Sequence, residues 1–325
     1  MKWETMKATR DAFGETIVEL GKKNDKIVVL SGDLEDATRT EKFKKEIPER
    51  FFNIGIAEQD LVGTAAGLST MGFIPFVCSF AVFLTGRACD QIRLSVCYNN
   101  RNAKLVGTHA GVTVGEDGGS AQALEDFALT RVMPNMCVVC PCDAIETKKA
   151  VIAAVDRNGP LYLRLGRAPV PVVTSETDPF EIGRANTLRQ GGDVTIIACG
   201  VMVSEALSAA EILRSENIDA RVLNMHTIKP IDVEEIIKSA RETGAIVTAE
   251  EHQINGGLGG AVSEVVARSY PVPVEMVAVN DQFGESGTAE QLLVKFHLKD
   301  KDIVEAARSA ILRKNSSLVC EGAHV

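Results

Sequence analysis

One carboxyl group in this 325-residue chain stands where a short strand gives way to a helix. Residues 50–52 are aromatic and strand-like, and apolar residues recur at helical spacing over 61–71. Glu58 therefore lies at the start of a helix, directly after the apolar segment 54–57. Because apolar surroundings disfavour the charged form of a carboxyl group, we expect that Glu58 can stay protonated and donate a hydrogen bond. The alternative is a glutamate that only complements the helix macrodipole.

A glycine-rich loop is the second place suited to chemistry. Five glycines fall within residues 107–119, and glycine lets a backbone approach a ligand closely. The same loop contains His109 and Asp117, whose side chains can exchange hydrogen bonds with hydroxyl and carbonyl groups. We therefore expect a substrate to meet this loop.

The elements that must position these residues alternate between apolar strands and helices. In the first half we expect strands at 27–30, 74–78, 104–107, 136–140 and 161–164, with helices at 11–20, 61–71, 83–98 and 144–154. A second series has strands at 194–198, 220–223, 245–249 and 274–278, helices at 204–213 and 233–240, and then a polar C-terminal region. This pattern predicts an α/β fold with two doubly wound domains, each a mostly parallel sheet covered by helices.

Prolines mark the boundary between the two series. Pro169, Pro171 and Pro179 interrupt the pattern, and proline is typical of linkers. We expect one domain over residues 1–170, a linker over 171–192 and a second domain over 193–325.

Composition agrees with a soluble enzyme subunit. Hydrophobic residues make up 45% of the chain, which suffices for sizeable cores, and the net charge of −9 argues against nucleic acid as a partner. The start of the chain lacks the features of a signal peptide, and its most apolar run, 72–84, is too short to span a bilayer. We expect a cytoplasmic protein without a membrane partner.

The eight cysteines do not predict a metal site. Cys137 and Cys140 have C-x-x-C spacing, but they lie in an expected buried strand, without a second pair or a nearby histidine at ligand spacing. Cysteine in apolar segments behaves as a small hydrophobe. We also interpret His226 and His252 as structural histidines rather than ligands.

The segment around Glu58 resembles the cofactor-activating motif of the transketolase and 1-deoxyxylulose-phosphate synthase family. The resemblance extends through nearly the whole chain, because further landmarks of that family follow in family order. They are Leu30-Ser31-Gly32-Asp33-Leu34, Ser79-Phe80-Ala81-Val82-Phe83, Asp90-Gln91-Ile92-Arg93, Thr108-His109, Val114-Gly115-Glu116-Asp117-Gly118, Leu165-Gly166-Arg167, Glu250-Glu251-His252 and Val279-Asn280-Asp281-Gln282-Phe283-Gly284.

The resemblance implies thiamine diphosphate as cofactor. In the family the glutamate that matches Glu58 hydrogen-bonds the pyrimidine ring nitrogen and promotes loss of the thiazolium proton, which makes Glu58 a catalytic as well as a cofactor-binding candidate. Phe80 and Phe83 match aromatic residues that pack on the pyrimidine ring, and Asp33 is a further cofactor-binding candidate. For the two phenylalanines, ordinary core packing is the alternative.

The resemblance also implies where a sugar would bind. His109 matches a histidine near the reacting carbonyl and hydroxyl groups, and Asp117 matches a carboxylate that contacts a substrate hydroxyl. Arg10 and Arg167 match positions that grip the sugar phosphate, which suits the fork of a guanidinium. Arg164, three residues before Arg167 at the end of the expected strand, is expected to be only a solvated strand residue.

Two positions depart from full-length transketolases. Many of those proteins carry a histidine where Ala121 stands, and several carry a serine at the position of Ala37. Both positions lie in or near the phosphate end of the family's substrate channel, so the sugar chain length and the need for a phosphate are left open.

Full-length members of the family also bind the diphosphate and Mg²⁺ through a Gly-Asp-Gly motif, and that triplet does not occur in this chain. We therefore expect a split enzyme, in which a separate N-terminal transketolase subunit supplies the diphosphate site and the Mg²⁺ ligands. A homodimer or an α2β2 heterotetramer is expected, with a broad apolar interface.

Three functions remain open at this point. The first is the C-terminal subunit of a split transketolase that moves a two-carbon ketol unit from a ketose phosphate to an aldose. The second is half of a 1-deoxyxylulose-phosphate synthase or the β subunit of a 2-oxo acid dehydrogenase. The third is a non-catalytic regulatory relative.

Overall fold

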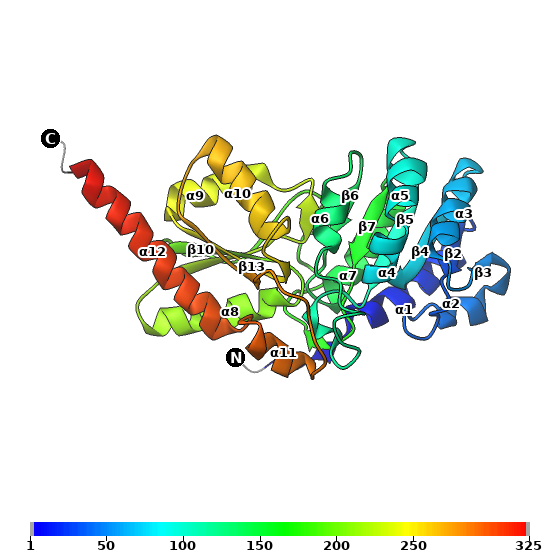
Figure 1. Ribbon diagram of the computed structural model, residues 1–325, viewed down its shortest axis with the longest axis horizontal. Helices are drawn as coiled ribbons and strands as arrows, with labels where there is room; N and C mark the ends of the chain where they lie inside the picture. Colours follow the sequence, from blue (N-terminus) through cyan, green and yellow to red (C-terminus); the bar gives the residue numbers. More distant parts are fainter. Residues whose placement is uncertain (1–2, 323–325) are drawn as a thin grey trace.

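The computed structural model describes residues 3–322, with side chains described as far as 316. Two α/β lobes lie side by side, the N-terminal one coloured blue to green and the C-terminal one mainly yellow to red (Figure 1). This arrangement confirms the expected fold class.

The N-terminal lobe contains a seven-stranded sheet in the order β12-β6-β7-β5-β4-β2-β3. All neighbours are parallel except β12, which runs antiparallel to β6. The strands are β2 (Ile27–Ser31), β3 (Phe51–Asn53), β4 (Ile74–Phe80), β5 (Lys104–Thr108), β6 (Cys137–Val139), β7 (Leu161–Arg164) and β12 (Thr227–Lys229). The last strand comes from the second half of the sequence, so the two halves share this sheet.

Alternating residues of these strands pack into two separate cores. Val29 and Phe76 face a core shared with helices α1 (Thr9–Lys23) and α7 (Ala144–Asp156). Leu30 and Val77 face the opposite core. The elements on that side are α3 (Glu58–Thr70), α4 (Ala81–Arg87), α5 (Cys89–Gln91), η2 (Ile92–Tyr98) and α6 (Asp126–Arg131). Burial on both faces explains why the strands are apolar along their whole length.

The C-terminal lobe contains a five-stranded sheet in the order β14-β13-β10-β11-β9, parallel except for the edge strand β9. Its strands are β9 (Asn186–Arg189), β10 (Val194–Ala198), β11 (Ala220–Asn224), β13 (Ile246–Gln253) and β14 (Val274–Val279). Helices α9 (Val233–Thr243) and α10 (Leu258–Ser269) cover one face, and α8 (Met202–Ser215) and α12 (Asp300–Gly322) cover the other (Figure 1).

The structure differs from the sequence-based expectation in three places. The expected helix over 83–98 is divided into α4, α5 and a π-helical segment, η2, after exposed Gly86 and Arg87. The segment expected as a linker contains β9. The polar C-terminal region forms α11 (Ala289–Lys295) and α12, because apolar residues at helical spacing, including Ile303 and Ala307, are buried against the sheet.

Small additional elements complete the described part of the chain. They are β1 (Met6–Lys7), α2 (Glu41–Glu46), η1 (Pro48–Arg50), η3 (Val112–Val114) and β8 (Val170–Pro171), which pairs antiparallel with β1. Within the described residues, no helix is both long enough and apolar enough to cross a bilayer.

Candidate active site at the carboxyl edge of the first sheet

Most of the predicted site residues gather along one edge of the seven-stranded sheet. Parallel strands bring their carboxyl ends to the same edge, where α/β proteins commonly bind ligands. Taken across neighbouring strands, the edge carries Glu58 after β3, Asp33 after β2, Phe80 at the end of β4, His109 after β5 and Arg167 after β7.

Glu58 is buried at the first position of α3, and its carboxylate has two partners. Arg87 Nη1 donates to Oε2 at 3.0 Å and to Oε1 at 3.2 Å, and Ser79 Oγ donates to Oε1 at 3.2 Å. The carboxylate is therefore held from β4 and from the end of α4, across the top of the sheet.

The surroundings expected for Glu58 from sequence are wrong in one respect. Ile56 is 75% exposed instead of packing around the carboxyl group, and a guanidinium contacts the carboxylate. The carboxylate of Glu58 therefore lies among polar partners and not in the apolar pocket expected from sequence.

A row of stacked rings leads from Glu58 to the glycine-rich loop. The guanidinium of Arg87 lies 4.0 Å from the ring centroid of Phe83. Phe83 stacks on Phe80 with centroids 5.4 Å apart, and Phe80 stacks on the ring of His109 at 3.8 Å. We call Glu58, Arg87, Phe83, Phe80 and His109 the site row.

His109 ends the site row in a constrained backbone conformation, with φ of 57°. Its Nδ1 lies 2.9 Å from Thr108 Oγ1, and its Nε2 lies 3.3 Å from Arg10 Nη1. Burial, reinforced by the nearby charges of Arg10, Arg167 and Arg39, lowers the pKa of His109 to about 3. The imidazole is therefore neutral at physiological pH and can hydrogen-bond a ligand without carrying charge.

Arg10 and Arg167 line a cavity of about 250 Å³ beside His109, together with Glu116 and the backbone of 113–115. Arg167 Nη1 donates to Val114 O at 2.5 Å and to Glu116 Oε2 at 3.1 Å. Arg10 Nη1 donates to Ala37 O at 2.9 Å, and burial lowers the pKa of Arg10, with the neighbouring Arg39 as the next cause.

Asp117 lies beside Arg167, one of the residues that line this cavity. Its carboxylate is 3.7 Å from Arg167 Nη1 and partly exposed. Buried Arg10 Nε has no hydrogen-bond partner among the described residues.

Asp33 stands apart from the ring stack. It has φ of 63° after β2, its side chain is exposed, and its Oδ1 accepts a hydrogen bond from Asn53 Nδ2 at 3.0 Å. It lies on the same edge as Glu58, but this hydrogen bond ties it to β3 and not to the site row.

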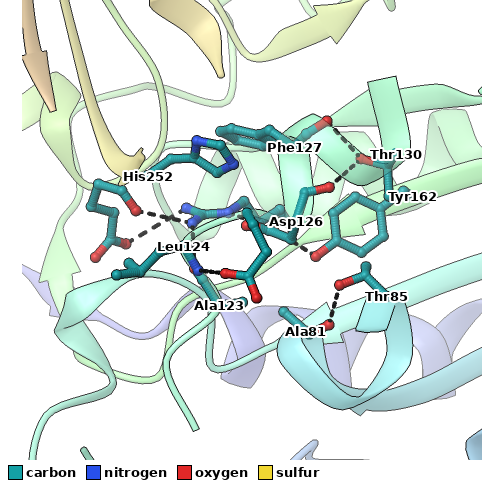
Figure 2. A network of polar contacts seen from close by, with 12 residues as sticks. Ala81, Thr85, Ala123, Leu124, Asp126, Phe127, Thr130, Tyr162 and His252 are labelled. Carbon is teal, nitrogen blue, oxygen red and sulfur yellow. Dashed lines mark hydrogen bonds and ion pairs between the residues drawn. The ribbon is translucent and has the colours of Figure 1, made fainter. Parts of the chain in front are cut away.

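The expectation that Arg164 is solvated is wrong. The side chain is buried, its Nε donates to Asp126 Oδ2 at 2.8 Å, and its guanidinium lies 4.5 Å from the ring centroid of Phe127. Figure 2 shows Asp126 and Tyr162 in the network around this charge, with His252 stacked above Phe127.

Sequence reasoning missed Arg87 and Ser79 as partners of Glu58. A cation four residues after Phe83 on a helix lies on the same face one turn later, and this spacing could have identified Arg87. Ser79 lies in an apolar strand, and nothing in the sequence around it indicates that its hydroxyl group contacts Glu58.

Cys137, Cys140, His226 and His252 are buried. Burial raises the pKa of the Cys137 thiol to about 11, and within the described residues no cluster of metal-ligating side chains occurs. His226 stacks on Phe180 with centroids 4.3 Å apart, and burial lowers its pKa to about 4.

The donors and rings of the site row suit one end of a thiamine-type cofactor. A carboxylate for a ring nitrogen and aromatic faces for a flat heterocycle are both present at Glu58, Phe80 and Phe83. The described residues offer no matching set of ligands for a divalent cation beside a diphosphate.

An α/β fold with a carboxylate, stacked rings and converging cations at its carboxyl edge defines a cofactor-dependent enzyme subunit. Residues 5–172 match the family described as transketolase, pyrimidine binding domain, and residues 183–303 match transketolase, C-terminal domain. The chain belongs to the transketolase family, whose members depend on thiamine diphosphate.

Relatives include subunits of transketolases that are divided between two chains. A 6-deoxy-6-sulfo-D-fructose transketolase subunit of Clostridium sp. (strain MSTE9) is 44% identical over 306 residues, covering 94% of this chain and 95% of that protein. An apulose-4-phosphate transketolase subunit of Phocaeicola vulgatus is 41% identical over 304 residues, covering 93% and 97% respectively. A solved structure described as a split gene transketolase, inactive beta4 tetramer, has a TM-score of 0.89 and 53% identity, covering 94% of this chain and 99% of that one.

Proposed function

We propose that this chain is the C-terminal subunit of a split transketolase, which transfers a two-carbon ketol unit from an anionic ketose to an aldose acceptor. The observation that carries the proposal is the continuous site row, from the Glu58 carboxylate through Phe83 and Phe80 to His109, ending at the cationic cavity of Arg10 and Arg167. A carboxylate suited to a cofactor and a cavity suited to a sugar thus share one edge of one sheet.

The residues of this chain would share the work as follows. Glu58 would hold the pyrimidine ring by a hydrogen bond to a ring nitrogen, and Phe80 and Phe83 would orient that ring by packing against it. When bound, thiamine diphosphate supplies a nucleophilic thiazolium carbon. A hydrogen bond between Glu58 and the ring would require the Arg87 contact to open, which the half-exposed Arg87 side chain allows.

The sugar end relies on charge and on a neutral imidazole. His109, kept neutral by burial, hydrogen-bonds the reacting carbonyl and hydroxyl groups. Arg10 and Arg167 bind the anionic group of the sugar, and Asp117 accepts a hydrogen bond from a hydroxyl group. A phosphate is one such anion, and the 6-deoxy-6-sulfo-D-fructose relative acts on a sugar whose anionic group is a sulfonate.

We propose that the diphosphate and Mg²⁺ are held by a separate N-terminal chain of the enzyme. The relatives named as subunits, and the split gene transketolase described as an inactive beta4 tetramer, support a two-chain enzyme. A homodimer of this chain, or an α2β2 heterotetramer with the partner, is the assembly we propose. A cytoplasmic location stays a prediction of the sequence.

Exposed apolar side chains on the layer of α3 and η2 fit this assembly. Ile56 before α3, Met71 after α3 and Tyr98 at the end of η2 are 75%, 73% and 77% exposed, and α3 packs against η2. Large apolar side chains exposed along this layer are candidates for contact with another chain. Replacing Ile56 and Tyr98 by serine should prevent assembly without unfolding the chain, as measured by light scattering and circular dichroism.

The test is reconstitution of ketol transfer. The chain would be assayed alone and with its partner subunit, with thiamine diphosphate, Mg²⁺, a ketose phosphate and an aldose phosphate. We expect transfer only in the mixture. A stable complex that instead consumes a 2-oxo acid would move the assignment to the dehydrogenase or the 1-deoxyxylulose-phosphate synthase.

Glu58→Ala distinguishes catalysis from a regulatory role. We expect the variant complex to assemble normally and to lose at least about a hundredfold in ketol transfer. Unchanged activity of the reconstituted variant complex would remove Glu58 from the mechanism and favour a non-catalytic relative.

A further inference from the structure

Glu251 belongs to β13 of the C-terminal lobe, yet its carboxylate reaches the glycine-rich loop of the other lobe. Its Oε2 accepts the backbone N–H of Thr113 at 3.0 Å, and both residues are buried. A hydrogen bond from a backbone N–H to a carboxylate is charge-assisted and stronger than a neutral one. The loop is therefore attached to the neighbouring lobe at this point.

The loop backbone lies directly against this carboxylate. Gly111 has φ of 78°, and a Cβ at that position would lie 2.1 Å from Glu251 Cδ. The Gly111 N–H also donates a hydrogen bond to Ala123 O at 2.9 Å, which holds the loop backbone in place. Glu251 thus fills the space that a side chain at position 111 would need.

The residues on either side of this contact belong to the proposed sugar site. His109 lies two residues before Gly111, and Val114, which follows Thr113, uses its carbonyl to accept Arg167 Nη1. A shift of the Thr113 backbone would therefore move both the imidazole and the guanidinium that face the sugar.

Arg164 fixes Glu251 in turn. Its Nη2 donates to the backbone O of Glu251 at 3.1 Å and to Ala123 O at 3.3 Å, and its Nη1 lies 3.8 Å from Glu251 Oε1. Figure 2 shows the labelled Ala123, Asp126 and Tyr162 around this buried charge. Arg164 thus contacts both Ala123, which follows the loop in sequence, and the strand that carries Glu251.

A second contact from the C-terminal lobe lies further along the loop. Gln122 Nε2 donates to Glu285 O at 3.0 Å, and a Cβ at Gly119 would lie 2.5 Å from Gly284 O. The loop is thus held by the C-terminal lobe near Thr113 and again near Gln122.

We propose that Glu251 is a positioning residue for ketol transfer, which holds the loop so that His109 and Arg167 meet the sugar. The C-terminal lobe then takes part in building the substrate site, beyond its part in packing. The kinetic consequence rests on the proposed function, whereas the positioning of the loop does not.

Glu250 provides a matched control on the same strand. It is also a buried glutamate that accepts backbone N–H groups, those of Leu258 at 2.7 Å and Gly259 at 2.8 Å. Its contacts lie at the start of α10 and at His252, whose Nδ1 is 3.8 Å from Glu250 Oε2, and not at the loop. Glu250→Ala therefore removes a similar interaction without touching residues 109–119.

The experiment compares Glu251→Ala, Glu251→Gln and Glu250→Ala in the full chain assembled with its partner subunit. Hydrogen exchange of peptides that cover 109–119 is measured first. We expect about a tenfold faster exchange of this loop in Glu251→Ala, because a charge-assisted hydrogen bond is lost. Glu251→Gln should restore most of the protection, since its amide oxygen can still accept the Thr113 N–H, and Glu250→Ala should leave the loop unchanged.

Steady-state kinetics with a ketose phosphate provide the second readout. We expect Glu251→Ala to raise KM for the ketose phosphate about tenfold, with a smaller change in kcat, because the loop must be ordered again on binding. Unaltered loop exchange in Glu251→Ala, or equal effects of Glu250→Ala, would overturn the positioning role. Absence of ketol transfer by the wild-type complex would instead refute the proposed function, while the exchange data would still decide the role of Glu251.

Discussion

Arg87 bridges both carboxylate oxygens of Glu58 with a single guanidinium nitrogen, at 3.0 and 3.2 Å. The two members of the pair differ in burial, because the Glu58 side chain is 2% exposed and the Arg87 side chain is 48% exposed. The carboxylate is therefore the member that has lost its water, and Arg87 replaces part of that hydration.

Arg87→Met should destabilise the isolated chain. Removal of the cation leaves a buried carboxylate with Ser79 as its remaining side-chain donor, and the expected loss is about 1–2 kcal/mol, less than for a fully buried pair because Arg87 reaches solvent. Urea unfolding of the chain without cofactor measures this loss. The control is Lys45→Met on α2, where the partner Glu41 is exposed, and no measurable change is expected there. Equal losses in the two variants would contradict a special role for the Glu58 contact.

His109 should remain neutral well below pH 6. Burial and then the positive charges around it set its folded pKa near 3, below the ordinary value of 6.5. Between these values the unfolded chain binds a proton that the folded chain does not, so this group contributes stability that is lost as pH falls from about 6.5 toward 3. Nitrogen-15 NMR of labelled histidine would check this, with the urea-unfolded chain as reference. A His109 signal that titrates near pH 6.5 in the folded chain would show that the imidazole is accessible and would refute the neutral role.

Glu146 should give the opposite pH dependence. Burial raises its pKa to about 7 although Cys142 N–H and Asn224 Nδ2 donate to it. Between pH 4.5 and 7 the folded chain keeps a proton that the unfolded chain has released, so stability is lost as pH rises through this window, by on the order of 3 kcal/mol. The free energy of unfolding, measured at several pH values for wild type and Glu146→Gln, isolates this group from His109. We expect the difference between the two proteins to change across the window, and a constant difference would refute the prediction.

The fold could be predicted from sequence where buried apolar residues recur at regular positions along the chain. The strands of both sheets are apolar on both faces, and this run of apolar residues predicts parallel strands. Helix α12 was missed because its apolar residues, such as Ile303 and Ala307, are spaced among many charges. The division of the helix after Arg87 depends on tertiary packing, which local propensity does not report.

The candidate site could be predicted only where its residues are close in sequence or match a family motif. Glu58, Phe80, Phe83 and His109 fall into one row in the structure, and their individual roles remain predictions. The contact of Glu251 with Thr113 joins residues 138 positions apart, so no local pattern could indicate it.

Arg164 and Asp126 form a fully buried ion pair. Removing one or both of these charges should show how much of the free energy of unfolding depends on their pairing. Arg164→Met leaves the Asp126 carboxylate buried, with Tyr162 OH as the donor to its Oδ2. Because the buried charge then has no partner of opposite charge, we expect the free energy of unfolding to fall by ~3–5 kcal/mol. In the double variant Arg164→Met/Asp126→Asn the charge is gone, while the amide oxygen can still accept the Tyr162 hydroxyl. We therefore expect the double variant to be about 2 kcal/mol more stable than Arg164→Met alone.

Urea unfolding of the wild type, both single variants and the double variant completes the thermodynamic cycle for this pair. Arg221→Met provides the comparison, because Arg221 is buried but its partner Glu242 is half exposed and can regain water. Its loss should be smaller than that of Arg164→Met. If Arg164→Met and the double variant were equally stable, the destabilisation would not come from an uncompensated charge on Asp126. It would come from the other contacts that both variants lose, which are the guanidinium over Phe127 and its hydrogen bonds to Ala123 O and Glu251 O.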